Sequence, residues 1–328
     1  MKHPAVVLLK AALAAACLWA PQALARPAHA RGFQFGVVGH VIQGNADEAL
    51  LRHAIEQANQ SGPAFVVATG IKAAGEACSD KLYGQRKAML DGSERPMIVS
   101  LAGSDWGDCR NSAGRSNAID RLNRLREVLF ADGQSLGDRR IALTRLSSSA
   151  KFRSYAENAH WEMGNVLFAT INLPARNNLY RKEAGRNSEF EDRMVANRAW
   201  LHRLFTLASR KKMEGVVLFS DGDVGVQVDE EFSLLSGFQS KKDGFAEPRK
   251  QIKALAEKFK GKVLLVDTQG AAANEPAIAW RGNLGHLSVA AEWAEVRVSP
   301  GTAALFDLKA GKAEAAPERT HERAQDRP

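Results

Sequence analysis

Residues 97 to 109 read MIVSLAGSDWGDC. The first five residues are mostly apolar and predict a short buried strand, and the next eight supply glycine, small polar groups, a tryptophan and two acids. In open α/β sheets, ligands bind beyond the carboxyl ends of the strands. A strand that runs out into such residues therefore indicates the edge of a functional site and places the chain among the α/β proteins.

Similar short apolar runs recur along the chain and alternate with amphipathic stretches. Strands are predicted at residues 33–38, 64–68, 97–101, 166–171, 215–219, 263–266 and 295–298, with 304–306 behind the last. Their nearly continuous apolar character is typical of strands that are covered on both faces. No Pro/Gly/Ser-rich linker interrupts residues 31–308, so we expect one α/β domain with sheet layers flanked by helices.

Three helices are predicted with some detail. The first follows Asn45 and Glu48, which have capping-box spacing. Its predicted buried stripe consists of Leu50, Leu51, Ala54, Ile55 and Ala58. Ser188 and Glu191 repeat the capping-box spacing before a long second helix, and a third helix is predicted over residues 248–261.

The N-terminus predicts export. Two lysines precede an apolar run at residues 11–20, and the small-residue site Ala23-Leu24-Ala25 follows it, which is typical of a signal peptide over residues 1–25. Ala28-His29-Ala30 is an alternative cleavage site, and Cys17 is a weaker candidate lipoprotein acceptor. No later stretch has the roughly 18 apolar residues of a membrane span. We therefore expect a periplasmic or secreted protein.

The charge pattern argues against a nucleic-acid partner. Loss of Lys2 and Lys10 with the signal peptide lowers the formal net charge from +8 to +6. The basic clusters are Arg121, Arg124 and Arg126, and Arg210, Lys211 and Lys212. No aromatic residues interleave with them, which favours solvated helix faces. The last residues, 309–328, contain alanines and charges but no large apolar side chain, so this tail is predicted to be disordered.

Cysteine content also fits an exported protein. With Cys17 removed in the signal peptide, only Cys78 and Cys109 remain, and an oxidising compartment favours a disulfide between them. Such a cross-link would stabilise the fold by roughly 3 to 4 kcal/mol. A redox or metal-binding thiol pair is the alternative, although neither cysteine has CxxC spacing.

Five segments lie at predicted strand ends, where the site is expected. They are residues 39–43, 69–72, 103–106, 220–223 and 267–270. In the first, His40 is placed to act as a single-metal ligand or a general base, or as a structural histidine. Asp221 and Asp223 have the spacing to bind Mg²⁺ or Ca²⁺, and an Asp-Gly turn explains the same pattern. Asp105 and Asp267 are catalytic candidates, with a loop cap and a strand end as their structural alternatives.

Other candidate residues have structural interpretations. Trp106 is predicted to pack over the disulfide, with Asp105 and Asp108 turning the loop, and stacking of a sugar or base on its indole is the alternative. His160 and His286 stand alone in the sequence and are interpreted as structural histidines. GxSxG, HExxH, P-loop and GxGxxG motifs are absent from the sequence, which excludes the common nucleophile and nucleotide signatures.

Six segments together resemble a family. They are GVVGHVIQG, FVVATGIKAAGEACSDKLY, SLAGSDWGDC, ENAHWEMGNVLFATINLPARNN, GVVLFSDGD and VLLVDTQG. Their order, over roughly residues 33–308, resembles a secreted bacterial branch of the calcineurin-like metallophosphoesterases. The most specific matches are the spacing from Ile71-Lys72 to Cys78-Ser79-Asp80 and the stretch from Trp106 to Cys109. The resemblance implies a two-sheet α/β sandwich with a two-metal phosphoesterase site at the strand ends, and it supports the disulfide.

The departures from the family pattern fall on the metal ligands. His40 stands where the resemblance implies the first aspartate, Gly70 where it implies the bridging aspartate, and Ser104 where it implies an asparagine. Asp267 stands where the resemblance implies a histidine, and residues 268–271 stand where it implies a Gly-Asp-x-His segment. Two dications about 4 Å apart repel by about 16 kcal/mol at an effective dielectric of ~20, so a bridging carboxylate is essential. Gly70 supplies none.

These observations lead to three hypotheses. The first is a degenerate metallophosphoesterase-like protein, a pseudoenzyme without a cofactor, that binds an unknown small-molecule or protein ligand in the strand-end cleft or acts as a scaffold. The second is an active phosphoesterase for mono- or diesters with Mn, Fe or Zn in a rearranged site of His40, Asp105, Asp221, Asp223 and Asp267. The third is a redox protein with a labile disulfide.

Overall fold

Two β-sheets form the centre of the protein in a computed structural model. The structure describes residues 31–39, 48–181, 187–225, 243–269, 276–289 and 292–309. The predicted signal peptide, His40, Asn45, residues 270–271 and the tail beyond residue 309 lie outside the described residues.

The first sheet has five strands in the order β12-β11-β1-β2-β3. Strands β1 (Phe33–Val38), β2 (Val66–Thr69) and β3 (Met97–Ser100) are parallel neighbours. Strand β11 (Trp293–Val298) pairs antiparallel with β1, and β12 (Phe306–Leu308) pairs antiparallel with β11 at the edge. The carboxyl ends of the three parallel strands therefore meet at one edge of this sheet.

The second sheet has seven strands in the order β4-β5-β6-β7-β8-β10-β9. Its parallel centre consists of β6 (Val166–Thr170), β7 (Gly215–Phe219), β8 (Lys262–Asp267) and β10 (Leu284–Ser288). The remaining strands β4 (Thr144–Arg145), β5 (Ala159–Met163) and β9 (Ala279–Arg281) are antiparallel to their neighbours.

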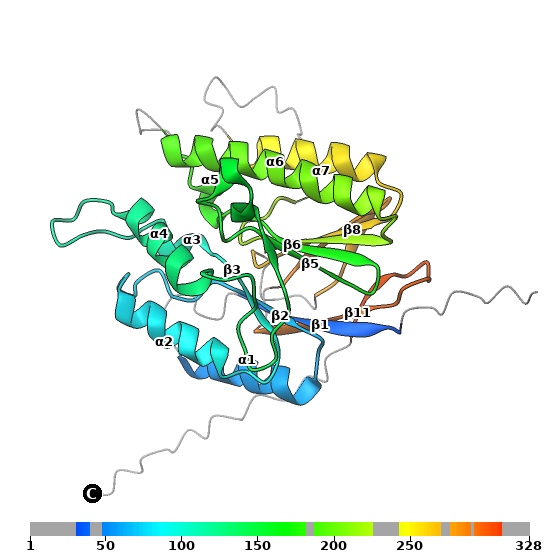
Figure 1. Cartoon of the computed structure of the whole chain (residues 1–328), viewed down its shortest axis with the longest axis horizontal. Helices are drawn as coiled ribbons and strands as arrows, with labels where there is room; N and C mark the ends of the chain where they lie inside the picture. The colour runs from blue at the N-terminus through cyan, green and yellow to red at the C-terminus, as the bar shows by residue number, and fades with distance from the viewer. Residues whose placement is uncertain are drawn as a thin grey trace, which may run out of the picture.

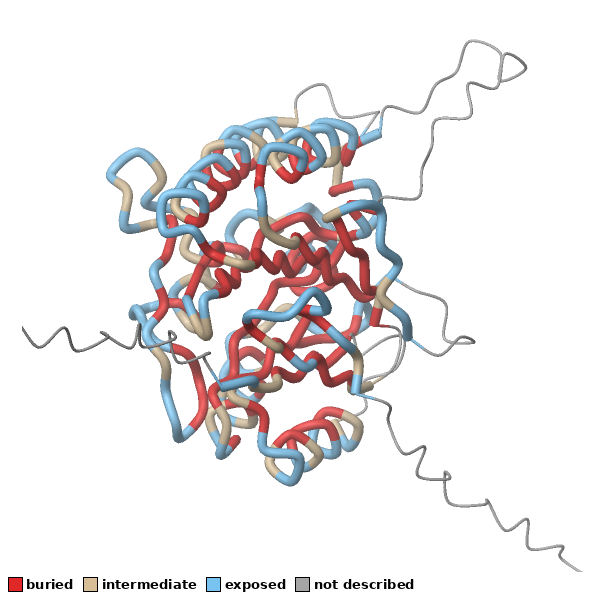
Figure 2. Tube along the Cα trace, turned by 90° about the vertical axis from the view of Figure 1, so that its right-hand side faces the viewer, coloured by how far each residue is buried: buried red, intermediate tan, exposed pale blue. Residues whose placement is uncertain are grey.

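Aromatic side chains from both sheets fill the space between them. Phe35 and Phe65 of the first sheet region stack at 5.4 Å between ring centroids. Phe65 meets Phe168 of β6 edge-on at 4.9 Å, and Phe35 meets Phe219 of β7 edge-on at 5.8 Å. Such edge-to-face pairs add to the free energy gained by burying the rings. Figure 2 shows the resulting buried centre with exposed residues around it.

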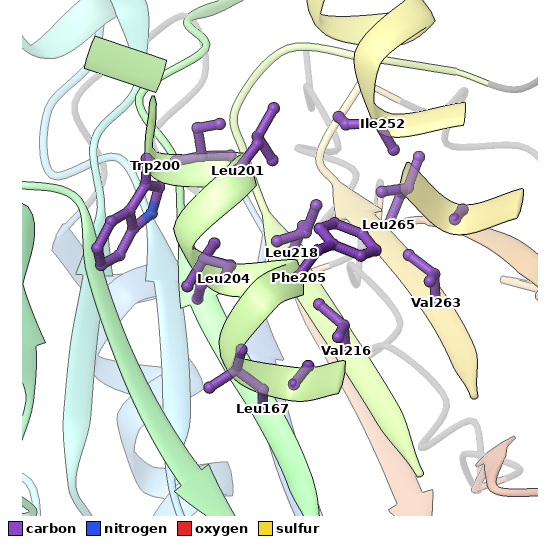
Figure 3. Close-up of a cluster of buried hydrophobic side chains, with 14 of the residues drawn as sticks. Leu167, Trp200, Leu201, Leu204, Phe205, Val216, Leu218, Ile252, Val263 and Leu265 are labelled. Atoms are coloured by element: carbon purple, nitrogen blue, oxygen red, sulfur yellow. The ribbon is translucent and has the colours of Figure 1, made fainter. Parts of the chain in front are cut away.

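Helices cover the outer faces of the two sheets (Figure 1). Helices α1 (Glu48–Ser61), α2 (Asp80–Asp91) and α4 (Ala118–Leu129) bury apolar residues in one cluster with the first sheet. Helices α6 (Ser188–Arg210) and α7 (Ala246–Lys258) cover the second sheet. Figure 3 shows Trp200, Leu204 and Phe205 of α6 above strands β6, β7 and β8. The predicted two-sheet α/β sandwich flanked by helices is thus confirmed.

Most predicted elements are present. The differences are four strands that were not predicted and the cap residue of the long helix. The predicted strands at residues 33–38 and 215–219 match β1 and β7 to the residue. Strands β4, β5, β9 and β10 were not predicted, because they are short or contain polar residues and glycine. Ser188 is not the cap of the long helix: Asn187 precedes α6 as the N-cap residue, and Ser188 is its first helical residue. Across the described residues, no helix combines the length and apolar character needed to cross a membrane.

Candidate functional site

The strand ends of the two sheets meet in one region. Short helix α3 (Gly103–Trp106) follows β3, and the backbone N–H of Gly103 donates to Oδ2 of Asp221, which follows β7, at 2.7 Å. The edge predicted from the end of the third strand is therefore in contact with the carboxyl end of β7.

The carboxylate of Asp105 accepts backbone hydrogen bonds from the loops that follow β2 and β3. It is fully buried, and its Oδ1 accepts hydrogen bonds from the backbone N–H groups of Ile71 at 2.8 Å and Lys72 at 3.2 Å. Its Oδ2 accepts from the N–H of Ala102 at 2.8 Å. Backbone N–H groups stabilise a buried carboxylate strongly, so this geometry corresponds to a loop cap.

A buried lysine lies beside this carboxylate. Lys72 is 1% exposed, and its Nζ donates to the backbone carbonyl oxygens of Ala73 at 2.7 Å and Ser104 at 2.8 Å. The hydroxyl of Ser104 in turn donates to the carbonyl of Lys72 at 3.1 Å. Burial lowers the pKa of Lys72, and the neighbouring charge of Asp105 opposes this shift. A cationic side chain therefore belongs to the edge where the resemblance implies metal ions.

Gly70 differs from the implied aspartate in conformation as well as in chemistry. It follows β2 with a φ of 74°, in the left-handed region that favours glycine, and its N–H donates to the carbonyl of Ser100 at 2.9 Å. An aspartate at this position would have a strained backbone. Among the described residues, Gly70, Ser104 and the occupied Asp105 do not provide the ligands of a paired-metal centre at the first sheet edge.

Asp221 also connects loops. Besides Gly103, its Oδ2 accepts the backbone N–H of Ala175 at 2.7 Å, and the side-chain amide of Gln269 lies 3.4 Å from its Oδ1. The residue is 1% exposed. This carboxylate thus joins the loops that follow β3, β6 and β8.

Three donor side chains gather after β7, at the end of β8 and within β10. Asp223, Asp267 and His286 each offer a ligand atom, and these atoms all lie within 4.8 Å of one another. The Nε2 of His286 is 2.5 Å from Oδ2 of Asp267 and 3.5 Å from Oδ1 of Asp223. Asp267 also accepts a hydrogen bond from the hydroxyl of Ser288 at 2.5 Å. Among the described residues, this is the one group with the composition of a metal site.

The electrostatics of this group favour positive charge. Burial alone would lower the pKa of His286, but the hydrogen bond that its imidazole donates to Asp267 and the charges of Asp267 and Asp223 outweigh this effect, so the pKa is raised. Two carboxylates facing one imidazole therefore stabilise a cation between them, either a proton or a metal ion.

From the sequence, His286 was interpreted as a structural histidine and Ser288 was not considered. In β10 they lie on the same face, and the register pairs Ser288 with Asp267 and His286 with Leu265 on the neighbouring strand β8. The hairpin of β9 and β10 places them there, and no sequence motif marks it. His160 lies elsewhere, on β5, with its ring 5.5 Å from the ring of Trp200.

A cavity of about 320 Å³ adjoins the donor group on the side of α7. Its lining includes Val224 and Gly225, which follow Asp223, and Leu265, which pairs with His286. The charged residues in its lining are Arg249, Lys253, Glu257 and Arg281. Basic residues thus outnumber acidic ones, which favours an anionic ligand.

The disulfide and the tryptophan are parts of the loop scaffold. Cys78 and Cys109 are joined by a disulfide with their Cα atoms 5.8 Å apart. Trp106 is 2% exposed and the guanidinium of Arg193 lies 5.8 Å from its ring centroid. No sugar or base can stack on this buried indole, so that alternative is wrong. Asp108 instead forms an ion pair with Arg176.

The fold and the strand-end geometry define an α/β sandwich protein with a polar site at the carboxyl edge of its sheets. No protein-family model and no curated protein matches the sequence. One similar solved structure is described as a novel phosphatase from Mycoplasma pneumoniae, with a TM-score of 0.40 and 10% sequence identity. The match covers 79% of this chain and 72% of that chain. This distant likeness identifies no activity for the protein.

Proposed function

We propose that this is an exported metallophosphoesterase-like protein that binds a ligand at its strand ends and does not hydrolyse phosphate esters on paired metal ions. The observation that carries this proposal is the state of the first sheet edge. The carboxylate of Asp105 is occupied by three backbone N–H groups, and Lys72 provides a buried cation beside it. Gly70 offers no carboxylate to bridge two ions.

Export and domain organisation belong to the same proposal. Residues 31–308 form the metallophosphoesterase-like domain, residues 1–25 are its signal peptide, and residues 309–328 are a tail outside the domain. The disulfide between Cys78 and Cys109 supports a periplasmic or secreted location, because disulfides persist in oxidising compartments.

The ligand we propose is a small anionic molecule in the cavity beside α7. Lys253 and Arg281 supply positive charge there, with Arg249 paired to Asp243, while Ile252, Leu265 and Leu284 supply apolar surface. An aromatic or aliphatic phosphate or carboxylate combines the two features. Such pockets bind their ligands mainly by apolar contact and use a few polar groups for orientation.

A second candidate function is ester hydrolysis through a rearranged site. The specific observation in its favour is that Asp223, Asp267 and His286 bring their ligand atoms within 4.8 Å of one another. In that case a bound Mn, Fe or Zn ion would supply a nucleophilic water, and the two carboxylates and the imidazole would hold the ion.

One experiment separates the two functions. The untagged exported protein is assayed with p-nitrophenyl phosphate and bis(p-nitrophenyl) phosphate in the presence of Mn²⁺, Fe²⁺ and Zn²⁺, and its metal content is measured. We expect no turnover and fewer than two metal ions per chain. Turnover that Asp267→Ala or His40→Ala abolishes, with one or two ions per chain, would contradict the proposed function.

The binding role is tested by thermal shift with phenyl phosphate and benzoate as probes and phenol as the neutral comparison. We expect both anions, but not phenol, to raise the melting temperature, and Lys253→Ala to reduce that shift. Lys250→Ala is the matched control, because this exposed lysine lies on the same helix and is not part of the cavity lining. Equal shifts in the two variants would count against the cavity as the binding site.

A further inference from the structure

Asp223, Asp267 and His286 come from three neighbouring strands of the second sheet. Asp223 follows β7, Asp267 ends β8 and His286 lies within β10, and these strands are adjacent in the sheet order. We propose that the three side chains bind one divalent transition-metal ion, Zn²⁺ in the first instance. This goes beyond the proposed function, which concerns the loss of the paired centre at the other sheet edge and the ligand cavity.

The distances between the donor atoms suit a single ion. In a tetrahedral zinc site with bonds of about 2.1 Å, ligand atoms lie roughly 3.4 Å apart. The Nε2 of His286 and Oδ1 of Asp223 are 3.5 Å apart, which already meets this requirement. The hydrogen-bonded pair of His286 and Asp267, at 2.5 Å, has to open by about 1 Å as the ion replaces the shared proton.

Hydrogen bonds already orient both carboxylates. Oδ1 of Asp267 accepts from the hydroxyl of Ser288 at 2.5 Å and from the backbone N–H of Gln269 at 2.9 Å. This leaves Oδ2 of Asp267 directed at His286. The backbone N–H of Gly225 similarly holds Oδ1 of Asp223. Such partners of the ligands fix their orientation in metal sites, and their removal weakens metal binding.

The charge of the donor side chains suits one metal ion per chain, and their exposure leaves one coordination position of that ion open to a ligand. Two carboxylates and a neutral imidazole balance the charge of one dication, and a second dication would be left uncompensated. The side chain of Asp267 is 1% exposed whereas that of Asp223 is 47% exposed. The ion would therefore keep an open coordination position on the side of Asp223, next to the cavity beside α7.

The test is a metal titration of the untagged, full-length exported protein after removal of metals with a chelator. Isothermal titration calorimetry with Zn²⁺, followed by elemental analysis, should show one ion per chain. We expect Asp223→Asn to weaken Zn²⁺ binding by at least about tenfold, and Ser288→Ala to weaken it by roughly 10- to 100-fold. A Co²⁺-substituted sample gives a second readout, because His286→Gln should change its visible absorption spectrum.

Two matched controls accompany these variants. Asp120→Asn and His202→Gln change the same residue types at exposed helical positions and should leave Zn²⁺ affinity unchanged. Circular dichroism checks that each variant is folded. If His286→Gln does not fold, Asp223→Asn remains as the test variant, because the side chain of Asp223 is half-exposed. Absence of Zn²⁺ binding, or an affinity equal to wild type in Asp223→Asn and Ser288→Ala, would overturn this inference and leave the proposed function standing. Two ions per chain would overturn both.

Discussion

Asp105 illustrates how a carboxylate at a strand end can be structural. We expect Asp105→Asn to lower the free energy of unfolding by about 2 to 4 kcal/mol, because the amide replaces an ionised acceptor and turns an N–H donor toward other donors. Urea denaturation followed by tryptophan fluorescence measures this loss. Asp108→Asn is the matched control, since its ion pair with Arg176 lies at the surface and should matter by less than about 1 kcal/mol.

A catalytic Asp105 would give a different pattern. In that case Asp105→Asn would keep the stability of the wild-type protein and lose phosphoesterase turnover, and the loop-cap interpretation would be wrong.

His160 makes the stability depend on pH. Burial, with a smaller effect of the charge of Arg203, lowers the pKa of His160 to about 4. In the unfolded chain the group has a pKa of about 6.5, so the unfolded state binds a proton first as the pH falls. Its stabilising contribution is therefore present above about pH 6.5 and is lost between there and about pH 4.

We expect His160→Gln to remove this dependence. Between about pH 7.5 and pH 5, the wild-type free energy of unfolding should fall by about 2 kcal/mol more than that of the variant. Urea denaturation at the two pH values measures the difference. His202→Gln, at an exposed position of α6, should behave like the wild type; an identical loss in all three proteins would contradict the assignment.

Some residues of the site can be located from the sequence and others cannot. Gly70, Ser104 and Asp105 could be located from strand ends, because an apolar run followed by polar residues marks an edge. The contact between Asp267 and His286 could not be predicted. It depends on β10 lying beside β8, and this order is set by tertiary pairing of strands that are distant in the sequence.

Among the secondary-structure elements, a continuous apolar run was enough to predict a strand that is covered on both faces, as in β1 and β7. Strand β5 carries an exposed glutamate beside buried residues, and β10 contains Gly285, so neither has a continuous apolar run. A Cβ at Gly285 would lie 2.8 Å from the ring of Trp280, so this ring would have to shift to accommodate a larger residue. The pairing of β10 with β8 and β9 is therefore not evident from a local apolar pattern.

The disulfide fixes the start of α2 to the loop after α3. Ser79, next to Cys78, is the N-cap of α2 and accepts the N–H of Leu82 at 3.2 Å. We expect the double variant Cys78→Ala and Cys109→Ala to lower the free energy of unfolding by about 2 to 4 kcal/mol, because the unfolded chain regains the entropy of an open loop. Urea denaturation measures the loss, and fully reduced wild type should show the same change.

The same bond tests the redox hypothesis. Cys109 is 2% exposed and Cys78 is partly buried, so access of a thiol to the disulfide is restricted and we expect slow reduction of the native protein by mild thiols. Rapid reduction under native conditions, monitored by thiol labelling, would favour the redox protein instead.

At the scale of the whole molecule, the C-terminal edge strand holds the two sheets together. Phe306 of β12 is buried between the sheets, and a Cβ at Gly215 of β7 would lie 2.8 Å from its ring. We expect Phe306→Ala to lower the free energy of unfolding by about 3 to 5 kcal/mol through loss of burial and the cavity left behind. Asp307→Ala, at the adjacent exposed position, should change it by less than about 0.5 kcal/mol. Equal effects in urea denaturation would show that β12 does not close the sandwich.

The contacts of Lys72 affect whether the folding of the first sheet edge depends on metal ions in the medium. Because the amine of Lys72 is covalently attached to the chain, its hydrogen bonds to the carbonyl oxygens of Ala73 and Ser104 require no metal ion from the medium. This half of the molecule should therefore fold equally well in metal-starved and metal-replete conditions, and a strong chelator should not loosen it. Side chains of the protein itself hold the loops at this sheet edge, whatever the supply of metal ions.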